Sequence, residues 1–388
     1  MAAHSVLQVQ ELCDYIVDFL HDHPETLKPC ALVSPRLASS AQYHLFQEIR
    51  FGDGVKWNDA GACRRFCAVL NSSPHLAPLV QRIRACFTPD VLSQLCEVKL
   101  PNLSDLVLFR PLKDKLTPND VPKAARLIGF PSIRHLKLQD LVFIDIDVLS
   151  RLFQQCTHPL DSLALSHITI HKHLYFGPSV VFRGPANAKV KIKTLSFDSI
   201  SNSHWWLLDP QLPFDLSGLE DVDLGGTLSV SWLSLLESNR LSIRKLRIYA
   251  QDAINPKFTK SPIPPTVLAS LPVLTYLTIG SLGEELQDVE TLLEGLPPTN
   301  RLALLRIDIM TRPREDGLRQ LGAACASIGT GCTVEVNLWQ RYMSSGLGAS
   351  DMAGLVRAAF GEPDGKGRGR LVMRVDGAVI ENKRRIVE

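Results

Sequence analysis

A short apolar motif that recurs along most of the chain constrains its fold more than any other feature of the sequence. The motif has the form apolar-x-x-apolar-x-apolar. Clear copies begin at Leu103, Ile133, Leu160, Ile192, Leu219, Ile243, Leu274 and Leu302, and a weaker copy begins at Val80. Successive copies start 23 to 32 residues apart. A single copy is common by chance, but a long series at near-constant spacing predicts a repeat architecture.

Each copy of the motif predicts one short strand. Its last two apolar residues lie two positions apart, so they point to the same side of an extended chain. One repeat cannot bury so small an apolar set, whereas stacked repeats share a parallel sheet and one elongated core. The residues expected in that core include Leu163, Leu195, Leu246 and Leu277.

The motif and its spacing resemble those of leucine-rich repeats, whose period is about 20–29 residues. The resemblance implies an α/β fold, an irregular leucine-rich-repeat solenoid with a parallel sheet. The asparagine usual in the regular motif is absent after most strands, where Asp140 and Ser199 are weak substitutes, so we expect irregular loops. Helices are expected between strands at residues 147–156, 231–237, 265–271 and 289–296.

The sequence predicts four segments. Residues 1–50 form a helical module, 51–78 a helical linker, 79–312 the divergent repeats, and 313–388 a C-terminal cap with a charged tail. The linker helix is expected at residues 58–70. In the cap, helices are expected at 315–328 and 351–360, and strands at 333–338 and 371–375.

The first fifty residues carry a different pattern from the repeats. Apolar residues at Leu12, Ile16, Phe19 and Leu20 form one helical stripe within residues 11–21. A second helix is expected at 26–37, where Ser34-Pro35 ends or re-caps it, and a third at 37–46. Three helices in so short a segment rarely fold well alone, so the module is expected to lean on a partner or on the rest of the chain.

This segment resembles the F-box-like module of many fungal proteins. The resemblance rests on ELCDYIVDFL at 11–20, LKPCALVS at 27–34 and YHLF at 43–46. Gln8 and Val9 stand where the family usually has Leu-Pro, and Leu37 where it has Trp. The resemblance implies docking on a Skp-type adaptor of a cullin–RING ubiquitin ligase. The residues that would form or underlie the docking surface are Leu12, Ile16, Leu32 and Val33. The alternative is that these helices only cap the repeats.

Composition narrows the class of protein. The 388 residues carry a formal net charge of +2, with 45% hydrophobic and 21% charged residues. This composition indicates a folded chain. Because the net charge is close to zero, the chain has no overall electrostatic field that would attract it to nucleic acid or to an anionic membrane. We find no secretory signal and no membrane-length apolar run, so we expect an intracellular protein, cytoplasmic or nuclear. Its nine cysteines are expected to be buried free thiols.

Few residues suggest a catalytic or metal-binding site. His167, His171 and His173 could share a strand face as metal ligands, but a solvated loop is the preferred interpretation. Asp145 and Asp147 precede an apolar helix, so a helix cap is favoured over a paired-carboxylate site. Trp205-Trp206 could anchor a partner or pack in the core, and the basic runs 365–370 and 383–385 are expected to be solvated. No catalytic, metal or cofactor motif is found, so an enzyme, such as a hydrolase, is not favoured.

The residues flanking each inward pair must face the other side of the sheet and form one concave ladder. In this ladder the acidic side chains of one strand, the acidic rung, lie beside the basic side chains of the next strand, the basic rung, and beside two tyrosines. This combination suggests a binding surface for a protein target. The predicted contact residues are Asp221, Asp223, Lys245, Arg247, Tyr249 and Tyr276. The rungs could instead only neutralise each other. The resulting hypothesis is a substrate-recognition subunit of a Skp–cullin–F-box ligase, and the alternative is a repeat scaffold without a ubiquitin role.

Overall fold

The computed structural model describes most of the chain. The described residues are 9–52, 60–110, 115–116, 118–119, 121–170, 189–198, 213–225, 230–250, 264, 266–281, 286–297, 300–310, 313–326, 328, 331–339, 349–360, 371–375 and 378–383. They belong to two compact units. Unit 1 comprises Met1–Lys191 with Gln211–Phe214, and unit 2 comprises Ile192–Pro210 with Asp215–Glu388.

The N-terminal part of unit 1 is a three-helix module. Its helices are α1 (Gln10–Phe19), α2 (Pro24–Val33) and α3 (Pro35–Gln47). Helix α2 ends four residues before the predicted end, because Ser34 is extended (φ −148°, ψ 134°). The Ser34 hydroxyl accepts a hydrogen bond from the backbone N–H of Arg36, so the serine caps α3.

The rest of unit 1 alternates strands with helices. Its main sheet has the order β1-β2-β3-β5-β7, and all of these neighbours are parallel. The strands are β1 (Glu48–Arg50), β2 (Arg82–Cys86), β3 (Asp105–Phe109), β5 (His135–Gln139) and β7 (Leu160–Ser166). A second parallel sheet holds β4 (Lys115–Leu116), β6 (Val142–Phe143) and β8 (Thr169–Ile170). The helices are α4 (Ala60–Ser72), the 3-10 helix η2 (Pro74–Leu79), α5 (Pro89–Glu97), α6 (Val121–Ile128) and α7 (Ile146–Leu152).

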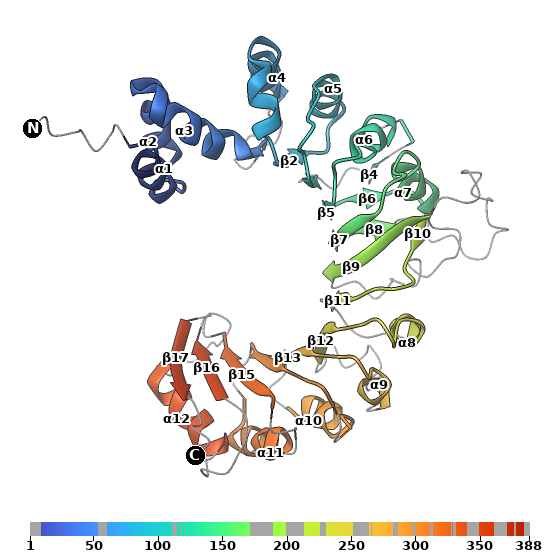
Figure 1. Cartoon of the computed structure of the whole chain (residues 1–388). Coiled ribbons are helices and arrows are strands. Elements are labelled where there is room, and N and C mark those ends of the chain that lie inside the picture. The colour runs from blue at the N-terminus through green and yellow to red at the C-terminus, as the bar shows by residue number, and fades with distance from the viewer. Residues whose placement is uncertain are drawn as a thin grey trace, which may run out of the picture. The chain divides into compact units, whose positions relative to one another are not determined.

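The helices of unit 1 form one layer beside its sheet. Helices α4 to α7 each pack against the next, and they all lie on one side of the strands (Figure 1). Cysteine thiols link successive helices through backbone carbonyls. Cys67 Sγ lies 3.5 Å from the carbonyl oxygen of Gln94, and Cys96 Sγ lies 3.3 Å from that of Lys123. All nine cysteines are free, as predicted, although Cys30 is only half-buried.

The parallel sheet begins earlier than the motif search indicates. Strand β1 follows α3 directly and pairs with β2, with Ile49 beside Ile83. This register shows that Phe46, Ile49 and Phe51 form a further copy of the repeat motif. Phe46 thus belongs to this first repeat as well as to the stretch 43–46 that resembles the F-box-like module.

Unit 2 continues the same construction. Its sheet has the order β9-β11-β12-β13-β14-β15-β16-β17. The strands are β9 (Val190–Asp198, which begins at the unit boundary), β11 (Asp221–Leu224), β12 (Lys245–Ala250), β13 (Tyr276–Ser281), β14 (Leu304–Ile309), β15 (Thr333–Leu338), β16 (Leu371–Val375) and β17 (Ala378–Lys383). The two-residue strand β10 (Phe214–Asp215) pairs with β9. The helices are α8 (Val230–Ser238), α9 (Thr266–Ala269), α10 (Gln287–Glu294), α11 (Glu315–Ala326) and α12 (Ala349–Phe360).

The sheet of unit 2 extends past residue 312, where the predicted repeats end. Strands β15 and β16 are parallel to β14, and only β17 is antiparallel. Val334 and Val336 take the inward positions of β15 and pair with Leu305 and Ile307. The motif is incomplete in this copy, because its first position is Gly331, which is not apolar.

The register of the strands aligns the motifs with one another. Leu195 pairs with Val222, Val222 with Leu246, and Leu246 with Leu277. In unit 1, Leu163 pairs with Leu136. The four leucines predicted to be buried, Leu163, Leu195, Leu246 and Leu277, are at most 2% exposed. Within each unit the inward face of one strand per motif therefore forms the core, and the predicted repeat architecture with a parallel sheet is confirmed.

The turns after the strands are irregular, as expected. Asp140 and His167 follow β5 and β7, and both have left-handed backbones, with φ of 55° and 52°. In unit 2 a buried asparagine, Asn239, follows α8. Its Oδ1 accepts hydrogen bonds from the backbone N–H groups of Gly218 and Leu219 at 2.8 and 3.1 Å. It thus links two repeats from the helix side, where the sequence reading did not look for an asparagine.

Candidate functional site

The outer face of the unit 2 sheet carries the predicted partner-binding residues. Asp221 pairs in register with Lys245, and Lys245 with Tyr276. One step along the strands, Asp223 pairs with Arg247 and Arg247 with Thr278. These side chains alternate with buried leucines and isoleucines, so they face away from the core. We call this side of the sheet the open face.

Neighbouring charges on the open face lie close to each other. Lys245 Nζ is 3.8 Å from Asp221 Oδ2, and Arg247 Nη1 is 3.8 Å from Asp223 Oδ2. Partial burial raises the pKa of Asp221, and the Lys245 ammonium opposes that shift. The acidic and basic rungs therefore do partly neutralise each other, as the alternative interpretation holds, at about 0.2–1 kcal/mol for each pair.

A buried carboxylate organises the next part of the open face. Asp308 on β14 is 0% exposed. Its Oδ2 accepts a hydrogen bond from Arg247 Nη2 at 3.2 Å, and its Oδ1 accepts from Arg306 Nε at 2.8 Å and Asn337 Nδ2 at 2.9 Å. Arg247 thus reaches across β13 to a residue two strands away. Sequence reasoning did not select Asp308, because a carboxylate after a motif gives no signal of burial.

Two aromatic side chains accompany these charges. The Tyr249 ring lies against Gly280 on β13, where any Cβ would overlap the ring, and the Arg247 guanidinium carbon is 5.4 Å from the Tyr249 ring centroid. Lys245 Nζ is 5.6 Å from the Tyr276 ring centroid. Both cations are within the range of cation–π attraction. The structure therefore brings the six predicted partner-binding residues together, and it adds Arg306 and Asp308 to them.

A second candidate surface lies on the N-terminal module. Helix α1 turns Cys13 and Val17 inwards, where they are buried. Its outward side carries exposed large apolar residues, which are Val9, Leu12, Tyr15, Ile16 and Phe19. On α2, Leu32 and Val33 are 87% and 76% exposed. The four predicted adaptor-contacting residues are thus all exposed.

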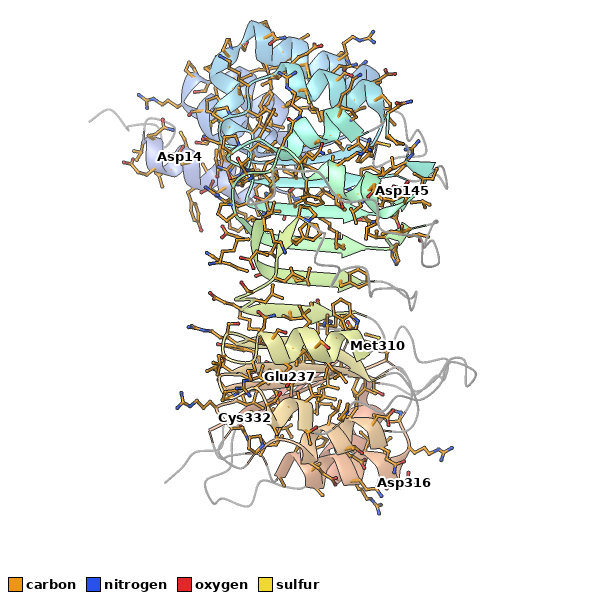
Figure 2. All side chains as sticks on the ribbon, turned by 90° about the vertical axis from the view of Figure 1, so that its right-hand side faces the viewer. Asp14, Asp145, Glu237, Met310, Asp316 and Cys332 are labelled. Carbon is orange, nitrogen blue, oxygen red and sulfur yellow. The ribbon has the colours of Figure 1, made fainter. Side chains whose placement is uncertain are left out.

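A polar cavity of about 470 Å³ lies between α1, α3 and η2. His44 Nε2 is 2.7 Å from Asp18 Oδ1, and the Ser40 hydroxyl donates to Asp14; Figure 2 labels Asp14 on α1. The Asp14 pKa is lowered by its hydrogen bonds from Ser40 and Gln10. His44 and Ser40 bond to different carboxylates, so they are not paired with each other as a nucleophile with its histidine base would be.

The remaining candidates have ordinary roles or lie outside the described residues. Asp145 caps α7, because its Oδ1 accepts a hydrogen bond from the backbone N–H of Val148 at 2.9 Å, which confirms the predicted cap. Burial and the nearby Asp145 carboxylate raise the pKa of Asp147. His167 is an exposed turn residue paired with Asp140 at 3.1 Å. The candidates outside the described residues are His171, His173, Trp205, Trp206, the run 365–370 and residues 384–385.

The described part of the chain has neither a metal-binding cluster nor a membrane-spanning helix. No cluster of three or more His, Cys, Asp or Glu residues there could hold a metal ion. Within the same residues, every helix is too short or too polar to cross a membrane.

Comparisons with known proteins give distant matches. No family model matches the sequence, and no curated protein matches it. A crystal structure of an internalin from Listeria monocytogenes is similar over 82% of this chain and 94% of its own, with 12% identity and a TM-score of 0.28. A crystal structure of a TLR13–ssRNA13 complex is similar over 75% of this chain, with 10% identity and a TM-score of 0.34, and this chain spans 44% of its length.

Proposed function

We propose that this chain is a protein-binding adaptor with two separate binding surfaces. The N-terminal helices dock on a Skp-type adaptor of a cullin–RING ubiquitin ligase, and the open face of the unit 2 sheet holds a protein target. In this function the chain carries out no chemistry itself. Other subunits would transfer ubiquitin to the target that the sheet retains.

The outward apolar stripe of α1 is the observation that carries the proposal. The buried core of the module is small: Val17, Leu27 and Ala41 form one cluster with partly buried neighbours, and Cys13 is also buried. More large apolar side chains lie outside this core than inside it. A contiguous exposed apolar surface of this kind marks a protein-interaction site. The identity of the partner rests on the resemblance of residues 11–46 to F-box-like modules.

The open face of unit 2 supports the second half of the proposal. Exposed tyrosine and arginine are the residue types enriched at binding hot spots. Tyr276 is 43% exposed and lies beside Lys245, and Arg247 and Tyr249 follow Lys245 on the same face of β12. The target would contact Asp221, Asp223, Lys245, Arg247, Tyr249 and Tyr276.

A second candidate function is a repeat scaffold whose N-terminal helices only cap the sheet. The continuity between α3 and β1 favours it. The backbone N–H of Gln81 donates to the carbonyl of Gln47 at 3.1 Å, and Gln47 Nε2 donates to Gln81 Oε1 at 3.2 Å. These contacts hold α3 on the first repeats, but they leave α1 and α2 uncovered. Capping and docking therefore use different helices.

The test is capture of a purified Skp-type adaptor by the full chain. We expect wild-type protein to form a stable complex in size-exclusion chromatography. The double change Leu32→Asp with Val33→Asp should abolish the complex without unfolding the chain, since both side chains are exposed and repeat stability is mainly nearest-neighbour. Leu241→Asp is the matched control, because Leu241 is 72% exposed and lies in unit 2. If wild-type protein forms no complex, the scaffold function stands and the adaptor function fails.

A further inference from the structure

Two arginines on the open face of unit 2 carry an inference beyond a general binding surface. Arg247 lies on β12 and Arg306 on β14, and Thr278 on β13 stands between them in register. Adjacent strands are about 4.8 Å apart, so the backbones of the two arginines are about 10 Å apart. Only a short hydroxyl side chain separates them. Both guanidinium groups can therefore reach one small group placed over Thr278.

Asp308 holds both arginines in place before any ligand arrives. The two guanidinium groups bond to opposite oxygens of its carboxylate, at 3.2 Å from Arg247 and 2.8 Å from Arg306. The Tyr249 ring supports Arg247 from the side. A free arginine loses much rotamer entropy when it binds a ligand. Since Asp308 already restricts both side chains, a ligand would meet a preorganised pair.

Hydrogen-bond donors remain on this pair. Within the described part of the chain, Arg306 bonds only through Nε, which leaves its two terminal nitrogens. The Arg247 Nε has no partner there either, but it is buried, so the terminal nitrogens of Arg247 are the ones that face a ligand. Arg247 Nη1 is 3.8 Å from Asp223, too far for a hydrogen bond. Side-chain exposure is 37% for Arg247 and 33% for Arg306. Guanidinium donors of this kind recognise the oxygens of a carboxylate or a phosphate.

The local charge selects between those two groups. The two arginines bring two positive charges and Asp308 one negative charge, so the trio has a net charge of +1. Asp223, near Arg247, compensates part of that charge. Glu335, the register partner of Arg306, is itself paired with Arg374 at 3.3 Å, so that pair adds no net charge. A carboxylate with one negative charge matches this balance better than a phosphate, which carries about −1.5 to −2.

We propose that Arg247, Arg306 and the Thr278 hydroxyl bind the carboxylate of an acidic side chain in the protein target. This site deepens the proposed function of the open face and rests on it. Asp308 is a positioning residue behind the two arginines. Asp223 competes with the incoming carboxylate for Arg247, so it limits the affinity of the site.

The experiment measures binding of fluorescein-labelled hexaglutamate and hexaglutamine peptides to the full chain by fluorescence anisotropy at low salt. We expect the glutamate peptide to bind and the glutamine peptide not to bind. Arg306→Gln and Arg247→Gln should each weaken binding about tenfold, since each removes a charge-assisted bond. Asp223→Asn should strengthen it several-fold. The matched control is Arg319→Gln on α11, which removes the same charge from the helix layer.

Three results would overturn the site. They are equal affinity for the two peptides, arginine variants that bind like the control, and no strengthening in Asp223→Asn. A hexapeptide of phosphoserine that binds more tightly than hexaglutamate would overturn the choice of carboxylate. Thermal unfolding checks that each variant is folded, and Asp223→Asn keeps the test decisive if an arginine variant unfolds. Adaptor capture, measured on the same variants, uses the N-terminal module, so failure of this site is distinguishable from failure of the adaptor function.

Discussion

The open faces of the two sheets differ, although their buried faces follow the same rule. In both units the inward positions are filled by apolar residues in register, mostly leucine and isoleucine. Outwards, β5 and β7 of unit 1 present His135, Lys137, Ser162 and Ala164. Strands β11 to β14 of unit 2 present paired charges, two tyrosines and the Asp308 cluster. The fold thus fixes one side of each strand and leaves the other side free to acquire a binding function.

The largest expected effect concerns the buried face of the sheet, which follows the same rule in both units. Leu163→Ala in unit 1 and Leu277→Ala in unit 2 should each cost about 2–5 kcal/mol, because both remove a fully buried side chain and leave a cavity. The two costs should be similar, and urea unfolding measures them. A cost below about 1 kcal/mol for either variant would show that its repeat does not share the common core.

The next effect tests the contrast between the open faces. Asp308→Ala should cost about 1–3 kcal/mol, because it leaves Asn337 and two arginines without their acceptor. The arginines are partly exposed and can be hydrated, which keeps the cost below that of a fully buried ion pair.

The matched control is Gln139→Ala, since Gln139 takes the same position after its motif in unit 1. It should change the free energy of unfolding by no more than about 0.5 kcal/mol. Equal costs for the two variants, measured by urea unfolding, would remove the distinction between the two faces.

The smallest effect concerns the contact between Tyr249 and Gly280. Gly280→Ala should cost about 1 kcal/mol, because the new methyl group displaces the ring from the backbone of β13. Tyr249 is partly exposed and can swing away, which keeps the cost low. In the double variant with Tyr249→Ala the cost should disappear, and thermal unfolding of the four proteins gives the coupling. If the free-energy costs of the two single changes simply add in the double variant, the Tyr249 ring does not rest on Gly280.

The sequence predicts the inward face well and the outward face poorly, for a physical reason. An inward position requires an apolar residue in every repeat, so the spacing of these apolar residues can be recognised from this sequence alone. Recognition fails where a glycine replaces the first apolar residue, as at Gly331, or where a motif overlaps another pattern, as at Phe46. The side chains that point outwards can be listed from the alternation. Their contacts depend on which residues meet across strands, so the burial of Asp308 and its link to Arg247, 61 residues away, could not be foreseen.

The N-terminal module shows the same limit. The periodicity correctly predicts three helices, but a stripe of apolar residues does not reveal whether it faces the core or a partner. In the structure the stripe of Leu12, Ile16 and Phe19 is exposed, and Cys13 and Val17 are buried instead. The exposure of Leu32 and Val33 also follows only from the packing of α2 on α3.

Amide hydrogen exchange of the full chain, alone and with each ligand, tests most directly the claim that the chain has two separate binding surfaces. With a purified Skp-type adaptor we predict slower exchange in α1 and α2 and no change in β12 to β14. With hexaglutamate we predict slower exchange in β12 to β14 and no change in α1 and α2. Protection of the same segments by both ligands, or no protection of α1 and α2 by the adaptor, would contradict the account.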